Sequence, residues 1–267
     1  MLDPSWALTR PILWVALVLL LAALVVRAIR KDRREYQRFK RYRTTVKRQA
    51  MMRKWLLESF LQFSGLSVIL LLLAAGYVLP LLQELTQWPG IRDLRGFVLQ
   101  DPGVVFGVSF GMLLAIVVLT AVGASAARKD KEGVATIGDV AAMLPRNRQE
   151  LVLGGLLSVN AGVVEELMFR LALPALVFGA TGSALAAALG SVLLFGALHV
   201  YQGVAGVIGS TVIGAIMMLL YAVSGTIAVP IIAHALFDLR SLVVIPVAVY
   251  GAHRVDGAMA PGAASGR

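Results

Sequence analysis

Two adjacent acidic residues, Glu165 and Glu166, lie within an apolar stretch that is long enough to cross a membrane. Together with Arg170 they are the only charged residues of the run 151–178. An ionisable side chain at the centre of a bilayer costs about 2.5–3.5 kcal/mol on insertion scales. Because neighbouring carboxylates also repel each other, at least one of the two needs a proton or a cationic partner. A cost of this kind is typical of a functional site.

The spacing of these charges gives the two acids different partners. Glu166 and Arg170 are four residues apart, about one helical turn, which favours an ion pair between them. Glu165 points about 100° away on the same helix. We therefore expect Glu166 and Arg170 to form a structural pair and Glu165 to be the reactive carboxylate. An interpretation in which both acids only hold helices together through hydrogen bonds stays open.

Two later apolar stretches add further ionisable groups. His199 follows Phe195 by four residues, so the phenyl ring can cover the imidazole on one helical face. His234 and Asp238 have the same spacing, and a carboxylate one turn from an imidazole can fix its tautomer. Taken singly, His199 can be a hydrogen-bonded packing residue and the second pair a local helix-stabilising one. Together, the acid pair, His199 and the His234–Asp238 pair lie on three helices that must be in contact. Three buried polar groups of this kind favour one shared polar site.

The composition defines the class of protein. Of 267 residues 58% are hydrophobic and 15% charged, and the mean hydropathy is +0.81. A soluble domain of this length could not bury so much apolar surface, so we expect an all-α polytopic membrane protein. The absence of cysteine excludes disulfides, thiolate metal sites and a cysteine nucleophile.

Hydropathy predicts a transmembrane helical bundle of about seven spans. They lie at about 11–26, 56–82, 104–126, 151–178, 183–202, 204–223 and 226–250. Very short turns join the last four, which makes these helices antiparallel neighbours. Four regions follow: an N-terminal anchor with a basic cytoplasmic segment (1–55), two spans and a cytoplasmic loop (56–150), a four-helix core (151–250) and a disordered tail (251–267).

The net charge of +10 is concentrated in one place. Thirteen Lys or Arg residues lie between Arg27 and Lys54, against only Asp32 and Glu35. This pattern predicts a cytoplasmic segment that lies as a surface helix on anionic lipids. Nucleic-acid binding is the weaker alternative, and we expect no nucleic-acid partner. The protein is expected in a bacterial plasma or inner membrane, with its N-terminus outside and its C-terminus in the cytoplasm.

Smaller signals concern packing and loops. Gly206, Ser210 and Gly214 recur every four residues and predict a face for close helix packing; a smooth wall beside a substrate groove is the alternative. Turn signals at Trp88 to Gly90 predict an outer loop over 83–102. The segment 133–144 is mildly amphipathic and is expected along the membrane surface.

The depths of the two histidines differ. At 1.5 Å per residue, His199 lies roughly 25 Å from the outer end of its helix and His234 about 12 Å from the outer end of the last span. The two can meet only if the helices are shifted or tilted. We therefore expect residues 198–202 to remain helical and to be lifted toward the middle of the membrane.

Three short motifs resemble those of one family. Residues 165–170 (EELMFR) resemble the EExxxR motif of the CPBP family, which comprises the type II CAAX prenyl proteases and the bacteriocin-processing and self-immunity intramembrane proteases. Residues 195–199 (FGALH) resemble its FxxxH motif, and 234–238 (HALFD) its HxxxN motif with Asp in the last place. The resemblance covers residues 151 to about 249, and the first 150 residues carry no family signal.

The resemblance implies a catalytic core over 151–250 and an intramembrane endopeptidase that uses water as its nucleophile. By similarity, Glu165 and His199 would activate the water, with Glu166 also in the catalytic set. His234 and Asp238 would stabilise the tetrahedral oxyanion. An Asp must stay protonated to donate a hydrogen bond as Asn does; otherwise Asp238 only orients His234. The supporting residues would be Arg170 and Phe195.

The substrate implied is a membrane-embedded or lipid-modified protein. A glutamate-type enzyme without a cofactor is expected, and zinc held by His199, His234 and Glu165 is the alternative. A non-catalytic scaffold or immunity-type protein that binds a membrane partner is a second function class. An ion-coupled transporter ranks last, because we find neither inverted repeats nor broken helices.

Overall fold

The structure is a computed structural model that describes residues 2, 5–107, 110, 111, 114, 117, 118, 121 and 138–256. Every regular element among these residues is helical, which confirms the all-α class. Four stretches of the described chain are long and apolar enough to cross a membrane: Thr9–Lys40, Thr45–Gln87, Ala184–Ser224 and Ala228–Tyr250. The protein is therefore an integral membrane protein.

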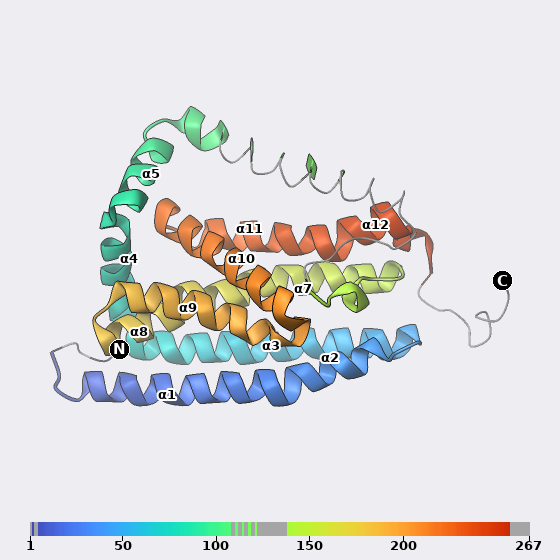
Figure 1. Ribbon diagram of the computed structural model, residues 1–267, viewed down its shortest axis with the longest axis horizontal. Helices are drawn as coiled ribbons and strands as arrows, with labels where there is room; N and C mark the ends of the chain where they lie inside the picture. Colours follow the sequence, from blue (N-terminus) through green and yellow to red (C-terminus); the bar gives the residue numbers. More distant parts are fainter. Residues whose placement is uncertain are drawn as a thin grey trace.

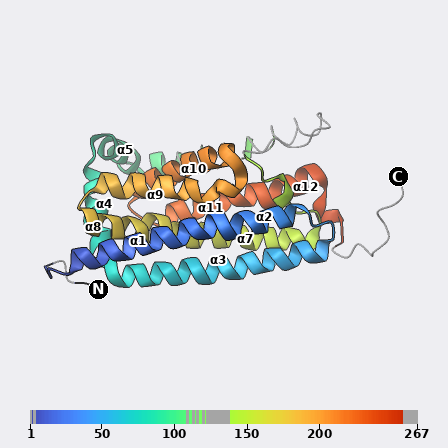
Figure 2. The same cartoon turned by 60° about the horizontal axis from the view of Figure 1, so that its bottom comes forward.

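The N-terminal third forms a long antiparallel hairpin (Figures 1 and 2). One rod consists of α1 (Thr9–Arg27), the π-helical segment η1 (Ala28–Asp32) and α2 (Arg33–Lys40), and α3 (Thr45–Ala74) returns beside it. The basic segment is thus not the separate surface helix that we expected. It forms the joined ends of two long helices, because good helix formers such as Lys and Arg continue both of them.

One face of α1 packs into the bundle and the opposite face is exposed. Its buried residues recur every three or four positions: Leu13, Leu17, Leu20 and Leu24. They pack in one apolar core with small side chains of α8 (Leu173–Thr181) and α9 (Ala184–Leu198). Small residues let helix backbones approach closely, which is how α1 is held against the core.

The segment after α3 differs from the prediction. α3 ends at Ala74, a single turn η2 (Ala75–Tyr77) follows, and the chain then bends away. The predicted outer loop is mostly helical: α4 (Val78–Gln87) and α5 (Pro89–Leu99) lie across one end of the bundle (Figure 1). The turn signal marked the break between these two helices, since Trp88 is extended and Pro89 occupies the first helical turn.

Two predicted features fall largely on residues that are not described. These are the third span, 104–126, and the beginning of the surface segment 133–144. In the latter, Ala141–Met143 form the single 3₁₀ turn η3.

The remaining chain forms the helical core. Its elements are α7 (Arg148–Glu166), η4 (Leu167–Ala172), α8, α9, η5 (His199–Gln202), α10 (Gly203–Ser224), α11 (Ala228–Leu239), η6 (Arg240–Val244) and α12 (Ile245–Tyr250). Left-handed glycines end three of the helices, at Gly182 (φ +73°), Gly225 (φ +74°) and Gly251 (φ +62°). The four last predicted spans are therefore helical, and α10 folds back across α9 (Figure 1).

The beginning of the tail is ordered, which corrects the prediction of disorder from residue 251. Residues Ala252–Arg254 form the short turn η7, and the backbone N–H of Arg148 donates to the carbonyl of Val255 over 3.0 Å. This bond satisfies an orphan donor at the start of α7. The predicted tail from 257 to 267 lies outside the described residues.

Candidate active site

Glu166 is at the centre of a buried polar cluster. His234 Nδ1 donates to Glu166 Oε1 over 2.6 Å. The other carboxylate oxygen, Oε2, lies 3.0 Å from Arg170 Nε, which confirms the predicted contact one turn along the helix. All three side chains are buried. Buried charges of this kind persist only when they are paired, so the cluster fixes α7 against α11.

Arg170 has further partners on other helices. Its Nη2 donates to the carbonyl of Gly214 in α10 over 3.2 Å, and its guanidinium lies 4.9 Å from the ring centroid of Phe195 in α9. Within the described residues, its Nη1 has no hydrogen-bonding partner although it is buried. The guanidinium therefore joins α7, α9 and α10 around the cluster.

Two of the motif helices widen directly after their motif acids. The π-helical segment η4 begins at Leu167, next to Glu166, and a second one, η6, begins at Arg240, two residues after Asp238. A π-turn inserts extra backbone into a helix and re-aims the side chains that follow, and such turns are frequent at functional sites.

Close approach of α7 and α11 depends on Gly162. A Cβ at this position would lie 2.9 Å from both the nitrogen and the Cβ of Ala235, and 3.0 Å from the carbonyl oxygen of Ile231. The missing side chain lets the two backbones touch one turn before the acid pair. This contact brings Glu166 within hydrogen-bonding distance of His234, and the sequence analysis did not identify it.

The second nitrogen of His234 faces two more carboxylates. Its Nε2 lies 4.0 Å from Oε2 of Glu165 and 3.8 Å from Oδ2 of Asp238. These distances are too long for direct hydrogen bonds. The carboxylate that fixes the imidazole is therefore Glu166 and not Asp238, in contrast to the expectation from the four-residue spacing. The side chain of Glu165 is 21% exposed, and this 4.0 Å contact is the one ion pair that it forms with the described residues.

His199 lies beside this cluster at the end of α9. Its Nδ1 is 2.8 Å from the carbonyl oxygen of Phe195, and the two rings are 4.8 Å apart. The Phe195 ring also meets the His234 ring edge to face at 6.0 Å. His199 lies within electrostatic range of His234 and Asp238. Phe195 thus links the two histidines, and in the described part of the chain Nε2 of His199 has no hydrogen-bonding partner.

The turn that carries His199 remains helical, as expected. The α-helix stops at Leu198, and residues 199–202 continue as one tighter 3₁₀ turn before Gly203 (φ +78°) starts α10. In Figure 1 this turn lies well within the length of α3 instead of at its end. Residues 199–202 are therefore helical, and their depth in the membrane stays a prediction.

The small residues Gly206 and Gly214 of α10, which were predicted to form one packing face, contact two different parts of the structure. A Cβ on Gly214 would lie 3.0 Å from Cδ1 of Phe195, so this glycine packs against α9 as expected. Gly206 instead meets Gln202 of the preceding turn and the loop residue Gly138.

The side chains do not form a ligand set for a metal. Within the described residues, no three His, Cys, Asp or Glu side chains are grouped so that they could hold an ion. The described side chains therefore do not fit zinc held by Glu165 and the two histidines.

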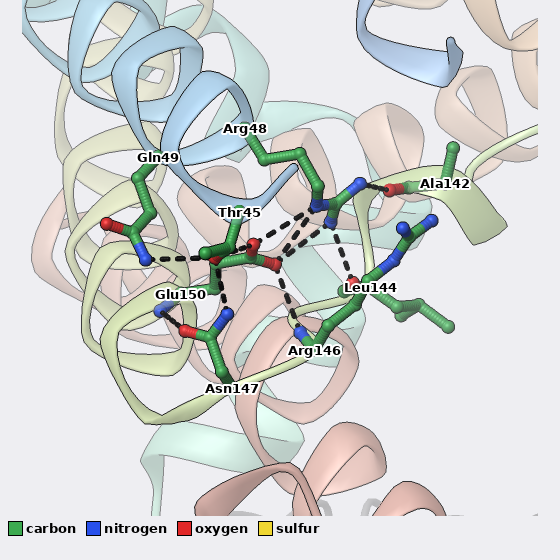
Figure 3. A network of polar contacts seen from close by, with 8 residues as sticks. All are labelled: Thr45, Arg48, Gln49, Ala142, Leu144, Arg146, Asn147 and Glu150. Atoms are coloured by element: carbon green, nitrogen blue, oxygen red, sulfur yellow. Dashed lines mark hydrogen bonds and ion pairs between the residues drawn. The ribbon is translucent and has the colours of Figure 1, made fainter. Parts of the chain in front are cut away.

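A second buried polar cluster, which the sequence analysis missed, joins α3 to the start of α7 (Figure 3). Arg48 and Glu150 form an ion pair at 3.1 Å with side-chain exposures of 1% and 0%. The guanidinium also donates to the carbonyls of Ala142 (2.8 Å) and Leu144 (3.1 Å). It thereby holds the chain that leads into α7.

Glu150 is equally well satisfied. It accepts from Thr45 Oγ1 over 2.9 Å and from the backbone N–H of Arg146 over 3.1 Å. Its own N–H donates to the side chain of the N-cap residue Asn147 over 2.9 Å. Asn147 followed three residues later by Glu is a helix-start signal that can be recognised in a sequence. Its partner Arg48 is hidden among the many cations of the basic segment.

The comparisons with known proteins match the part of the chain that carries the site. Residues 147–240 match the model of the family described as Rce1-like, type II CAAX prenyl endopeptidase. This range runs from the N-cap of α7 to the end of α11 and includes all three motifs. No curated protein and no solved structure gives a significant match.

Proposed function

Because residues 147–240 match the family model described as Rce1-like, type II CAAX prenyl endopeptidase, we propose that the chain is a CPBP-type protease that hydrolyses a peptide bond of a membrane-associated or lipid-modified protein. The water nucleophile is activated by Glu165 and His199. The observation that carries the proposal is the convergence on His234: its two nitrogens face Glu166, Glu165 and Asp238, and Phe195 links it to His199.

Glu165 is the better general base of the two acids. Glu166 is occupied by Arg170 and by Nδ1 of His234, and it is completely buried. Glu165 is partly exposed and has no such partners, so it can approach a water molecule and take up its proton. Nε2 of His199 is proposed to bind the same water, because Nδ1 is taken up by the carbonyl of Phe195.

His234 and Asp238 are proposed to stabilise the oxyanion. Because Nδ1 donates to Glu166, the ring of His234 can also donate from Nε2 to the oxyanion when it is doubly protonated. Since Glu166 orients the ring, Asp238 is free to act as the protonated donor that replaces the Asn of the motif. No metal takes part in this scheme.

The expected placement in the membrane belongs to the same proposal. Seven spans put the N-terminus outside and the C-terminus in the cytoplasm of a bacterial plasma or inner membrane. The basic ends of α2 and α3 then face the cytoplasm and bind anionic lipid head groups, because the exposed cations there exceed the acids.

Quantitative analysis of protein termini in membranes tests the function. Cells that contain the wild-type protein are compared with cells that contain Glu165→Gln at equal abundance. We expect a set of membrane-associated proteins to keep an uncleaved end only in the variant. If the variant restores every phenotype of a deletion strain and no terminus differs, the protein is a scaffold or immunity-type partner and the proposal is wrong.

A further inference from the structure

The N-terminal rod, which lies outside the matched residues, carries a charged pair next to the site. Arg27 Nε lies 3.3 Å from Asp32 Oδ1. Five residues apart, these side chains would diverge by about 140° on an α-helix. The π-helical segment η1, Ala28–Asp32, separates them and brings both onto one face. The π-helical segment η1 therefore allows this pair to form. The other two π-helical segments, η4 and η6, follow the motif acids.

The pair faces the helices of the site. η1 packs against η5, the turn that begins with His199. The guanidinium of Arg27 lies 5.1 Å from the ring centroid of Phe63, and this ring is 6.2 Å from that of Phe169 in η4. The pair is thus placed between the segment that follows the acid pair and the turn that holds the histidine.

A second contact extends the same interface. Tyr36 in α2 is buried, and its ring meets that of Tyr201 in η5 at 5.3 Å. The ring of Tyr201 in turn lies 5.9 Å from that of His199. The N-terminal rod therefore covers the His199 turn over more than one helical turn.

The charges of the pair act on different groups. Arg27 is one of the charges that act on Glu165, after the nearer His234, Glu166 and Arg170, and Asp32 acts on His199 after His234 and Asp238. Their side chains are only 21% and 30% exposed, so solvent screens these interactions weakly. A cation favours an ionised carboxylate and an anion favours a protonated imidazole.

We propose that Arg27 and Asp32 are positioning residues of the active site, with Arg27 stabilising the Glu165 carboxylate and Asp32 the positive charge on His199. The inference rests on the proposed function. It also gives the first helix, which carries no family motif, a role in the reaction. The pair acts through Glu165 and His199 and does not contact the reacting atoms.

The test uses the full-length protein in detergent with a fluorogenic peptide that ends in a farnesylated CAAX sequence. We expect Arg27→Gln to lower kcat about tenfold with KM unchanged, since one charge acts on the base across the site. Arg27→Lys keeps the charge and is expected to restore most of kcat. Arg92→Gln, which removes one exposed arginine on α5, is the control and is expected to leave kcat unchanged.

The double variant Arg27→Gln/Asp32→Asn separates electrostatics from local structure. It keeps a hydrogen-bonding pair on η1 but removes both charges, so we expect kcat to stay low. A double variant or an Arg27→Gln variant with wild-type kcat overturns the inference. So does a loss of kcat that Arg27→Lys does not restore. If the wild type itself does not cleave the peptide or any membrane protein in cells, the proposed function fails, and that result is distinct from these.

Discussion

His234 donates to Glu166 over 2.6 Å, although 68 residues separate them in the chain and both side chains are buried. This hydrogen bond distinguishes the structural role of Glu166 from the role proposed for Glu165. The two carboxylate oxygens of Glu166 contact His234 and Arg170. The carboxylate of Glu165 makes no hydrogen bond to the described residues. One acid therefore holds the site together and the other is left for chemistry.

Matched substitutions of the two acids should separate stability from activity. Glu166→Gln leaves the Arg170 cation buried and unpaired, so we expect a loss of about 3–5 kcal/mol of stability. Glu165→Gln should leave stability within about 0.5 kcal/mol, since it removes only the long, 4.0 Å contact with His234. Thermal unfolding in detergent measures both. Equal melting temperatures for the two variants would contradict the division of roles.

The contact of α7 with α11 gives a second prediction. In Gly162→Ala the new Cβ collides with the backbone of Ala235, so the helices must separate, at a cost of about 1–3 kcal/mol. The Glu166–His234 bond lengthens and cleavage falls. Gly155→Ala on the same helix is the control, because its Cβ would lie 3.7 Å from Val243, an ordinary contact. Similar melting temperatures and similar activity of the two variants would refute the explanation.

The buried cluster of Arg48 and Glu150 at the start of α7 should contribute to stability. Arg48→Lys keeps the charge but cannot serve the carboxylate of Glu150 and the two carbonyls together, so we predict a loss of about 1–3 kcal/mol in thermal unfolding. The exposed pair Arg92–Asp93 provides the comparison, and Arg92→Gln should cost at most about 1 kcal/mol. An Arg48→Lys variant as stable as the wild type would show that the hydrogen bonds of the guanidinium to Ala142 and Leu144 do not stabilise the fold.

The sequence predicted those parts of the site that follow from helical periodicity. The Glu166–Arg170 pair and the stacking of Phe195 on His199 are both contacts one turn apart, and both are present. The bond between Glu166 and His234 joins different helices, and periodicity carries no information about which atoms meet there. The same limit explains why Arg48 could not be assigned to Glu150 within a run of thirteen cations.

In the fold, too, features within one stretch of sequence were predicted and features that depend on packing were not. Apolar runs identified the helices of the core, and the turn at Trp88 marked a real break. Hydropathy could not show that α3 ends at Ala74, since the residues after it are equally apolar; the turn η2, which contains Gly76, follows there. π-helical turns also have no sequence signal, so the Arg27–Asp32 pair was not foreseen.

Metal removal gives a prediction about chemistry. Glu165 and the two histidines do not form a ligand set, so we expect the purified protein to keep its activity after treatment with a chelator and dialysis. The rate of peptide cleavage and the metal content of the sample are measured together. Loss of activity that zinc alone restores would mean that the side chains rearrange around a metal, and the metal-free scheme would be wrong.

The most direct test of the account is cleavage by the purified protein in lipid vesicles. A membrane-anchored, farnesylated CAAX peptide is the probe, and its products are identified by mass spectrometry for the wild type, Glu165→Gln and His199→Ala. We predict one defined cut by the wild type and a rate at least about 100-fold lower for each variant, with unchanged folding. Wild-type rates in both folded variants would contradict a shared site for Glu165 and His199.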